Sequence, residues 1–235
     1  ILGWEIMGLC SFLLIGHWWE ERANSEAALK AFWTVRVGDM GLLVGTGVLL
    51  VLFGNLDIST INEKAVEVGA EHKSLLAFAA VALFIACIGK SGQFPLHTWL
   101  PDAMAGPTPV SSLLHSSTMV VAGVFLVARL YPVFHTGLDI NIVGHHFNLI
   151  AIIGGITVLI AAGLAFVQND IKKVLAYSTV SQLGYMMMGL GVGAWMPAVF
   201  HIFTHAFFKC CLFLCAGSVA HTGSHHSFDM KKDMG

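Results

Sequence analysis

Long apolar stretches separated by short polar connections run from the first residue to about residue 220. Most have roughly the 20 residues that an α-helix needs to cross the hydrocarbon core of a bilayer. The first residues, ILGWE, already have the pattern of a helix interior, so we expect the first span to be truncated and the chain to be a fragment of a longer protein. The pattern predicts an all-α transmembrane bundle, a single membrane domain with about seven spans at residues 1–16, 32–53, 74–95, 109–130, 147–168, 174–192 and 194–220.

One apolar stretch is interrupted, between about residues 74 and 109. Gly92, Pro95 and Pro107 follow Lys90 in the sequence KSGQFPLHTWLPDAMAGP. Glycine and proline disrupt the helical hydrogen-bond ladder, and within a membrane the freed backbone groups are tolerated where they line a polar cavity. The sequence therefore predicts a discontinuous helix with a polar site beside Lys90.

The connections differ in charge. The polar residues 55–73 have room for one surface helix. Loops that face the cytoplasm, or its organellar equivalent, carry an excess of lysine and arginine. The loops after odd-numbered spans carry more of these residues than the others and are predicted to face that side: they contain Arg22, Lys30, Lys172, Lys173, Lys231 and Lys232, against Lys64, Lys73 and Arg129.

Composition indicates a membrane protein, and the cysteine and glycine patterns argue against several kinds of site. Apolar residues make up 56% of the chain and charged residues 11%, whereas soluble domains average about 45–50% and 25%. A net charge of −2 gives no indication of a nucleic-acid partner. The five cysteines lie in apolar runs without a C-x-x-C spacing, and no nucleotide-binding glycine motif is present. We therefore expect no disulfide, metal or cofactor site in this chain.

Several charged residues lie where a membrane helix is expected to be apolar. Glu5, Lys90 and Lys209 are well within apolar runs, and Asp39 is one turn into its span. Each charge near a bilayer centre costs about 2.5–3.5 kcal/mol on insertion scales. Pairing or a function must offset this cost. Buried ion pairs that hold helices in register are one explanation, and an ion relay is the other.

Glu5 and Lys90 are the predicted partners. A carboxylate beside a buried lysine favours its charged form, so a change in their separation would let the lysine take up or release a proton. Arg36 and Asp39 are three residues apart and so lie on one helix face. They form either an intrahelical pair or a support for Glu5.

Histidines continue the polar pattern. His201, His205 and Lys209 recur every four residues and share one helix face, where histidine can carry protons near neutral pH. Two histidines at this spacing can also bind a metal, but the lysine one turn later would repel a cation. His115 follows the broken helix and is either part of the relay or a satisfied core histidine. The polar residues of the sixth span are expected to make interhelical hydrogen bonds: Tyr177, Ser178, Ser181, Gln182 and Tyr185.

The stretch from Gly89 to Arg129 closely resembles the proton-channel signature of the antiporter-like membrane subunits of respiratory complex I. Four further segments match the large subunit of this family, its subunit L and subunit 5 branch, in the same order: GWEIMGLCSFLLIGHW, AFWTVRVGDMGLLVG, DIKKVLAYSTVSQLGYMMMGLG and FHIFTHAFFKCCLFLCAGSV. The resemblance implies a fragment running roughly from the fifth to the eleventh transmembrane helix. It implies a proton-translocating subunit of an NADH–quinone oxidoreductase without a redox group of its own, with NADH, FMN, iron–sulfur clusters and quinone bound by other subunits. Its implied partners are those other membrane subunits, the lipid bilayer and protons, in a multi-pass protein of a bacterial plasma membrane.

The resemblance also implies residue roles. Glu5 and Lys90 match the family's charge-switching pair, with Arg36 and Asp39 as the charged residues beside it, and His115 matches a histidine that links two half-channels. Later members of the hydrophilic axis are matched by His201, His205 and Lys209.

Two other readings stay open. The A subunit of multisubunit sodium/proton antiporters and the membrane subunits of energy-converting hydrogenases share the broken-helix signature, although the RVGD run and the C-terminal tail resemble complex I more. A different class of reading is a structural anchor that conducts nothing, in which the buried charges are packing pairs.

Overall fold

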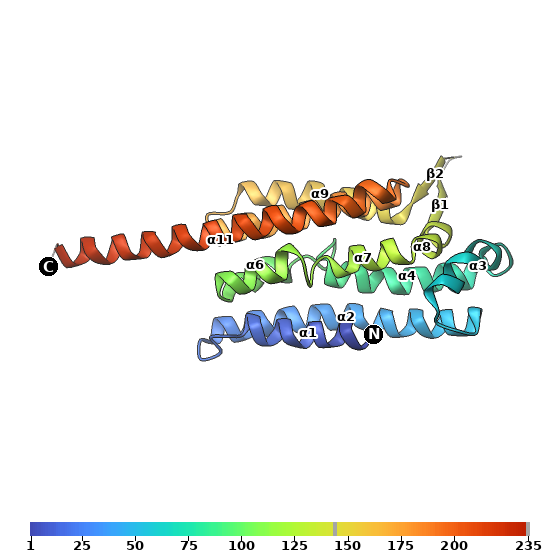
Figure 1. The fold of residues 1–235 in the computed structure, drawn as a ribbon, viewed down its shortest axis with the longest axis horizontal. Coiled ribbons are helices and arrows are strands. Elements are labelled where there is room, and N and C mark those ends of the chain that lie inside the picture. Colours follow the sequence, from blue (N-terminus) through green and yellow to red (C-terminus); the bar gives the residue numbers. More distant parts are fainter. Residues whose placement is uncertain (143–144, 234–235) are drawn as a thin grey trace.

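The computed structural model describes residues 1–142 and 145–233 as an elongated bundle whose main helices run nearly parallel to one long axis (Figure 1). The helices before the first strand are α1 (Leu2–Ile15), α2 (Arg22–Phe53), α3 (Ile58–Glu71), α4 (Lys73–Lys90), α5 (Trp99–Asp102), the 3-10 turn η1 (Ala103–Ala105), α6 (Thr108–Ser116), α7 (Ala122–Arg129) and α8 (Tyr131–Gly137). A two-stranded antiparallel hairpin, β1 (Asp139–Ile142) and β2 (His145–Asn148), leads to α9 (Leu149–Phe166), α10 (Ile171–Gly191) and α11 (Trp195–Asp233).

Four helices in the described part of the chain are long and apolar enough to cross a membrane: α2, α4, α9 and residues 195–223 of α11. The shorter α1 is also apolar. These apolar helices, with many large hydrophobic side chains exposed on them, confirm the predicted all-α membrane bundle. The hairpin is a small addition at one end (Figure 1).

The second predicted span begins earlier than expected. Residues 22–31 were expected in a polar loop, but α2 starts at Arg22. This segment is rich in alanine and also contains leucine, lysine and glutamate, which favour helix. Arg22 and Glu26 form an exposed ion pair of 2.7 Å one turn apart, which supports the added turns.

The predicted helix break is confirmed. α4 ends at Lys90, and Gly92 follows with φ of 55°, a conformation that favours glycine. The freed backbone groups find side-chain partners: the indole of Trp99 donates to the Gly89 carbonyl at 3.0 Å, and the Phe94 N–H donates to the Thr157 hydroxyl at 3.0 Å.

The predicted span 109–130 is wrong as one continuous helix. It divides into α6 and α7, separated by residues 117–121. At the break the hydroxyl of Ser116 donates to the Ser112 carbonyl at 2.6 Å, and that of Thr118 donates to the Leu113 carbonyl at 2.8 Å. Such local hydroxyl bonds compete with the helical ladder.

Close contact between α2 and α4 positions the candidate site. A Cβ added at Gly41 would lie 2.3 Å from the Ala82 carbonyl oxygen, so only glycine allows the two backbones to approach this closely. Asp39 lies two residues before Gly41 and is buried at the same interface. The side chain of Asp39 is thereby fixed against the end of α4.

Candidate functional site

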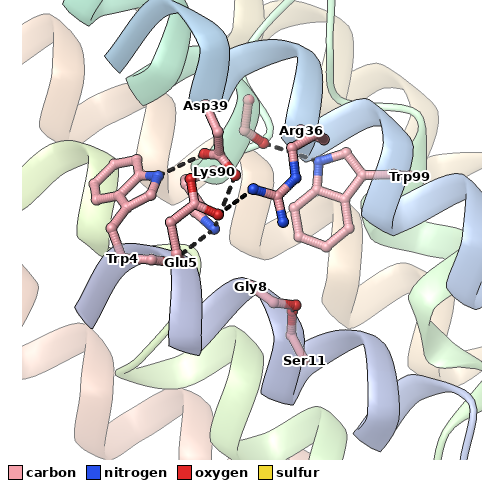
Figure 2. Close-up of polar contacts among 9 residues, drawn as sticks. Trp4, Glu5, Gly8, Ser11, Arg36, Asp39, Lys90 and Trp99 are labelled. Atoms are coloured by element: carbon pink, nitrogen blue, oxygen red, sulfur yellow. Dashed lines mark hydrogen bonds and ion pairs between the residues drawn. The ribbon is translucent and has the colours of Figure 1, made fainter. Parts of the chain in front are cut away.

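The first cluster of buried charge forms where α1, α2 and α4 meet (Figure 2). Lys90, the last residue of α4, is fully buried, and its Nζ lies 3.7 Å from Oδ2 of Asp39 on α2. The ammonium also donates to the Trp4 carbonyl of α1 at 3.2 Å. Asp39 is 2% exposed, so both charges of the pair are removed from solvent.

Glu5 has a different partner from the predicted one. Its carboxylate pairs with the guanidinium of Arg36, whereas Lys90 pairs with Asp39 (Figure 2). The Glu5–Arg36 pair is also less buried, with side chains 26% and 37% exposed. The direct Glu5–Lys90 pair that the sequence suggested is therefore wrong for this conformation.

The exchange of partners follows from helix geometry. Arg36 and Asp39 do not pair with each other within α2, as one prediction allowed; they reach separate partners on one side of the helix. The first turn of α1 presents Glu5 to one of them and Trp4 to the other. Of the alternative prediction, that Arg36 and Asp39 support Glu5, the structure shows the contact of Arg36 only, since Asp39 pairs with Lys90.

Trp4 contributes to this cluster, although the sequence pattern did not single it out. Its indole N–H donates to Oδ1 of Asp39 at 2.5 Å, and its ring centroid lies 5.4 Å from Nζ of Lys90. A tryptophan beside a glutamate in an apolar helix is usually a lipid-facing or packing residue, so the sequence contains no signal for this role.

A second cluster surrounds Lys209 on α11. Lys209 is fully buried, and its Nζ donates to the Ser178 hydroxyl of α10 at 2.8 Å and to the Leu175 carbonyl at 3.3 Å. The interhelical hydrogen bonding predicted for Ser178 is confirmed. These partners are neutral, so the site solvates the ammonium with dipoles.

Three histidines lie along the same cluster. His205 is fully buried, and its Nδ1 lies 3.2 Å from the Ser116 carbonyl at the end of α6, while its Nε2 is buried without a hydrogen-bond partner. His115 is fully buried with neither ring nitrogen bonded, and its ring lies 5.9 Å from that of Phe213. The rings of His201 and His205 are stacked with centroids 6.3 Å apart.

The structure thus brings the predicted residues into two groups. Glu5, Arg36, Asp39 and Lys90 form the first, and the second contains His115, His201, His205 and Lys209. No hydrogen bond or ion pair among the described side chains joins the two groups. The unbonded nitrogens of His115 and His205 are buried polar atoms of the kind that internal water normally satisfies.

A further charged feature lies at the end of the bundle where α2 begins. Nζ of Lys30 is 2.5 Å from Oδ2 of Asp102, and this pair borders a cavity of about 490 Å³ that also touches Lys173 and Asp170. The pairing of Lys30 with Asp102 was not predicted, because the two residues are 72 positions apart. In the part of the chain that the structure describes, no group of three or more His, Cys, Asp or Glu side chains is placed to hold a metal ion.

Comparison with known proteins gives one family. The family model described as NADH:quinone oxidoreductase/Mrp antiporter, TM matches residues 1–235. NAD(P)H-quinone oxidoreductase chain 5 of Synechocystis is 52% identical over 221 residues, covering 93% of this chain and 32% of the relative. NADH-quinone oxidoreductase subunit L of Pseudomonas aeruginosa is 49% identical over 230 residues, covering 98% of this chain and 36% of the relative. The chain therefore spans about a third of the length of the curated relatives it matches.

Solved structures share the fold. The Mrp complex from Dietzia contains a chain with a TM-score of 0.83 and 34% identity, covering 94% of this chain and 24% of that one. The membrane-bound sulfane sulfur reductase, an archaeal respiratory membrane complex, contains one with a TM-score of 0.78 and 29% identity, covering 92% and 36%. Both similar chains are parts of multisubunit membrane complexes, as are the subunits named above.

Proposed function

Because the chain belongs to the NADH:quinone oxidoreductase/Mrp antiporter transmembrane family, we propose that it forms the proton-translocating part of a membrane subunit of an NADH–quinone oxidoreductase, complex I. In this proposal it couples quinone reduction elsewhere in the complex to proton movement through its buried polar residues. The observation that carries the proposal is the burial of two lysines in a membrane bundle, Lys90 beside a carboxylate and Lys209 in a cluster with histidines whose ring nitrogens are unbonded.

Burial of these lysines argues against a purely structural role. A buried ion pair is weak evidence for stability, because desolvation offsets much of the attraction. Lys209 has no carboxylate partner among the described residues and is held by neutral oxygens. Keeping a buried ammonium charged without a carboxylate partner costs free energy, so a small change in its surroundings can add or remove its proton.

The mechanism we propose starts at α1. A signal from neighbouring subunits displaces the first turn of this helix, which holds Arg36 through Glu5 and touches Lys90 through the Trp4 carbonyl. Lys90 then passes its proton to His115 and on towards His201, His205 and Lys209. Moving a proton against about 150 mV costs roughly 3.5 kcal/mol, which is comparable with the loss of one buried charge interaction.

The remaining parts of the reaction are placed outside this chain. We propose that NADH, FMN, iron–sulfur clusters and quinone are bound by other subunits, that the chain is a non-redox subunit, and that lipid and the other membrane subunits are its direct neighbours. The Pseudomonas relative supports a bacterial plasma membrane. Other relatives are named as chloroplastic, so fractionation of the source cells is the test of this localisation.

The experiment uses the full-length subunit in its assembled complex, reconstituted in liposomes. Proton uptake per electron pair is recorded for wild type, Lys90→Ala and Glu5→Gln, with and without sodium. We expect both variants to assemble, Lys90→Ala to lose uptake, and Glu5→Gln to lose part of it. Normal stoichiometry in Lys90→Ala would refute the proposal and leave the structural-anchor alternative.

A second candidate function has a specific observation in its favour. The fold matches a chain of the Mrp complex with a TM-score of 0.83, so an A-type subunit of a sodium/proton antiporter is the alternative. The sulfane sulfur reductase match supports, in the same way, a subunit of a different respiratory membrane complex. Sodium-dependent transport without NADH oxidation would favour the antiporter subunit. Transport that depends on neither sodium nor NADH would favour the other respiratory complex.

A further inference from the structure

Trp4 contacts both members of the buried Lys90–Asp39 pair, and it does so through three separate groups. Its indole N–H donates to Asp39 at 2.5 Å, its carbonyl accepts from Lys90 at 3.2 Å, and its ring lies 5.4 Å from the Lys90 ammonium. The indole bonds to Oδ1 of the carboxylate while the ammonium approaches Oδ2 (Figure 2). The two donors therefore share one carboxylate without competing for the same oxygen.

These contacts of Trp4 help to set the position of α1, because the rest of this helix is packed by few buried residues. Apart from the first turn, α1 is fixed by few buried residues, namely Gly8, Ser11 and Ile15. Glu5, the next residue, binds Arg36 one turn from Asp39 on α2. A displacement of the first turn of α1 would therefore alter the solvation of Lys90, the hydrogen bonding of Asp39 and the Glu5–Arg36 pair at the same time.

We propose that Trp4 is a positioning residue for proton transfer: its indole N–H holds the Asp39 carboxylate in place for Lys90 and links this pair to the movement of Glu5. This inference rests on the proposed function, since it assigns Trp4 to the same proton-transfer site. The part of Trp4 that matters is the ring donor, and the aromatic bulk is secondary.

The test separates the donor from the bulk. Trp4→Phe keeps an aromatic ring and removes the N–H, whereas Trp4→His is smaller but retains a ring nitrogen at the corresponding place. A role in packing predicts that phenylalanine is the better replacement, and a role as a donor predicts that histidine is. Trp33→Phe is the matched control, because Trp33 lies on α2 and is 61% exposed.

The variants are compared with Lys90→Ala in the complex reconstituted in liposomes, by proton uptake per electron pair as a function of pH. Loss of a hydrogen bond to a charged group changes a protonation equilibrium about tenfold. We therefore expect the pH profile of uptake in Trp4→Phe to shift by about one pH unit, Trp4→His to stay closer to wild type, and Trp33→Phe to be unchanged.

Other results would overturn the inference. These are a Trp4→Phe profile equal to wild type, a Trp4→Phe variant that equals or exceeds Trp4→His, and equal losses in Trp4→Phe and Trp33→Phe. If neither Trp4 variant enters the complex, Trp4 is a packing residue and the inference is also wrong. Normal uptake in Lys90→Ala would instead refute the proposed function, so the two failures are distinguishable.

Discussion

At the scale of single residues, the two buried lysines are held in contrasting ways. Lys90 faces a carboxylate and a carbonyl, whereas Lys209 faces a hydroxyl and a carbonyl. A charged partner favours the ammonium form more strongly than neutral dipoles do. The ammonium groups of the two lysines are therefore stabilised by different kinds of partner, a charge at Lys90 and neutral dipoles at Lys209.

Gly8 controls the space around Lys90, which leads to a prediction. A Cβ added at Gly8 would lie 2.9 Å from Nζ of Lys90, so Gly8→Ala must displace the flexible ammonium from its position. Alanine favours helix by about 0.5–1 kcal/mol over glycine, which offsets much of the roughly 1 kcal/mol cost of mild overpacking. We expect nearly unchanged thermal stability and reduced proton uptake per electron pair in the reconstituted complex.

The control for this prediction lies on the same helix. Gly3 has open space where a Cβ would be added, so Gly3→Ala should retain full proton uptake. Equal uptake in Gly8→Ala and Gly3→Ala would show that the position of the Lys90 ammonium is not critical.

At the scale of helices, α3 provides a pH-dependent feature outside the membrane-spanning segments. Asp57 caps this helix: its carboxylate accepts from the backbone N–H of Thr60 at 3.0 Å and from the Thr60 hydroxyl at 2.8 Å. These hydrogen bonds lower the pKa of Asp57 below its ordinary value. Because the pKa is lower in the folded state, the stabilisation is complete above the unfolded pKa of about 3.9. It is lost as the pH falls through the folded value.

The lowered pKa of Asp57 leads to a prediction for three variants. Asp57→Ala should weaken the amide-exchange protection of the first turn of α3 at neutral pH, since the cap is lost. Asp57→Asn should keep the cap but abolish its pH dependence, which in wild type sets in as the pH falls below about 3.9. Glu63→Ala, an exposed position on the same helix, should change neither. Protection in Asp57→Asn that still falls with acid as in wild type would assign the pH dependence to another group.

The helix pattern shows what sequence could and could not predict. Gly92 and Pro95 have strong local effects on the backbone, so the break after Lys90 was predictable. The break between α6 and α7 depends on hydroxyl bonds from Ser116 and Thr118, and such residues occur equally in unbroken membrane helices. Likewise, burial of Lys90 and Asp39 was readable from their apolar neighbours. Their pairing was not, because it depends on how α1 and α2 are turned relative to α4.

At the scale of the whole molecule, the distribution of lysine and arginine agrees with the way the loops are divided between the two ends of the bundle. The connection between α1 and α2, the start of α10 and the C-terminal end of α11 gather at one end of the bundle, while α3, α8 and the hairpin lie at the other (Figure 1). The first end carries the lysines and arginines that the sequence predicts on the cytoplasmic side, among them Arg22, Lys30 and Lys172. The bundle length and this asymmetry together imply a fixed orientation across the membrane.

That orientation can be measured by thiol labelling. Glu20→Cys places an exposed thiol between α1 and α2, and Glu67→Cys places one on the exposed side of α3 at the opposite end. In sealed vesicles of known sidedness, a membrane-impermeant maleimide should label Glu20→Cys only from the cytoplasmic side and Glu67→Cys only from the other. The unsubstituted protein, with its own five cysteines, gives the background.

The two ways in which this labelling could disagree have different meanings. Labelling of both positions from one side would mean that the bundle does not span the bilayer along its long axis, contrary to the placement of Lys90 and Lys209 at membrane depth. Labelling from opposite sides in the reversed sense would keep the spanning bundle but invert it. The cavity beside Lys30 and Asp102 would then face away from the cytoplasm. The labelling pattern therefore fixes which end of the bundle, and which of its charged loops, faces each compartment.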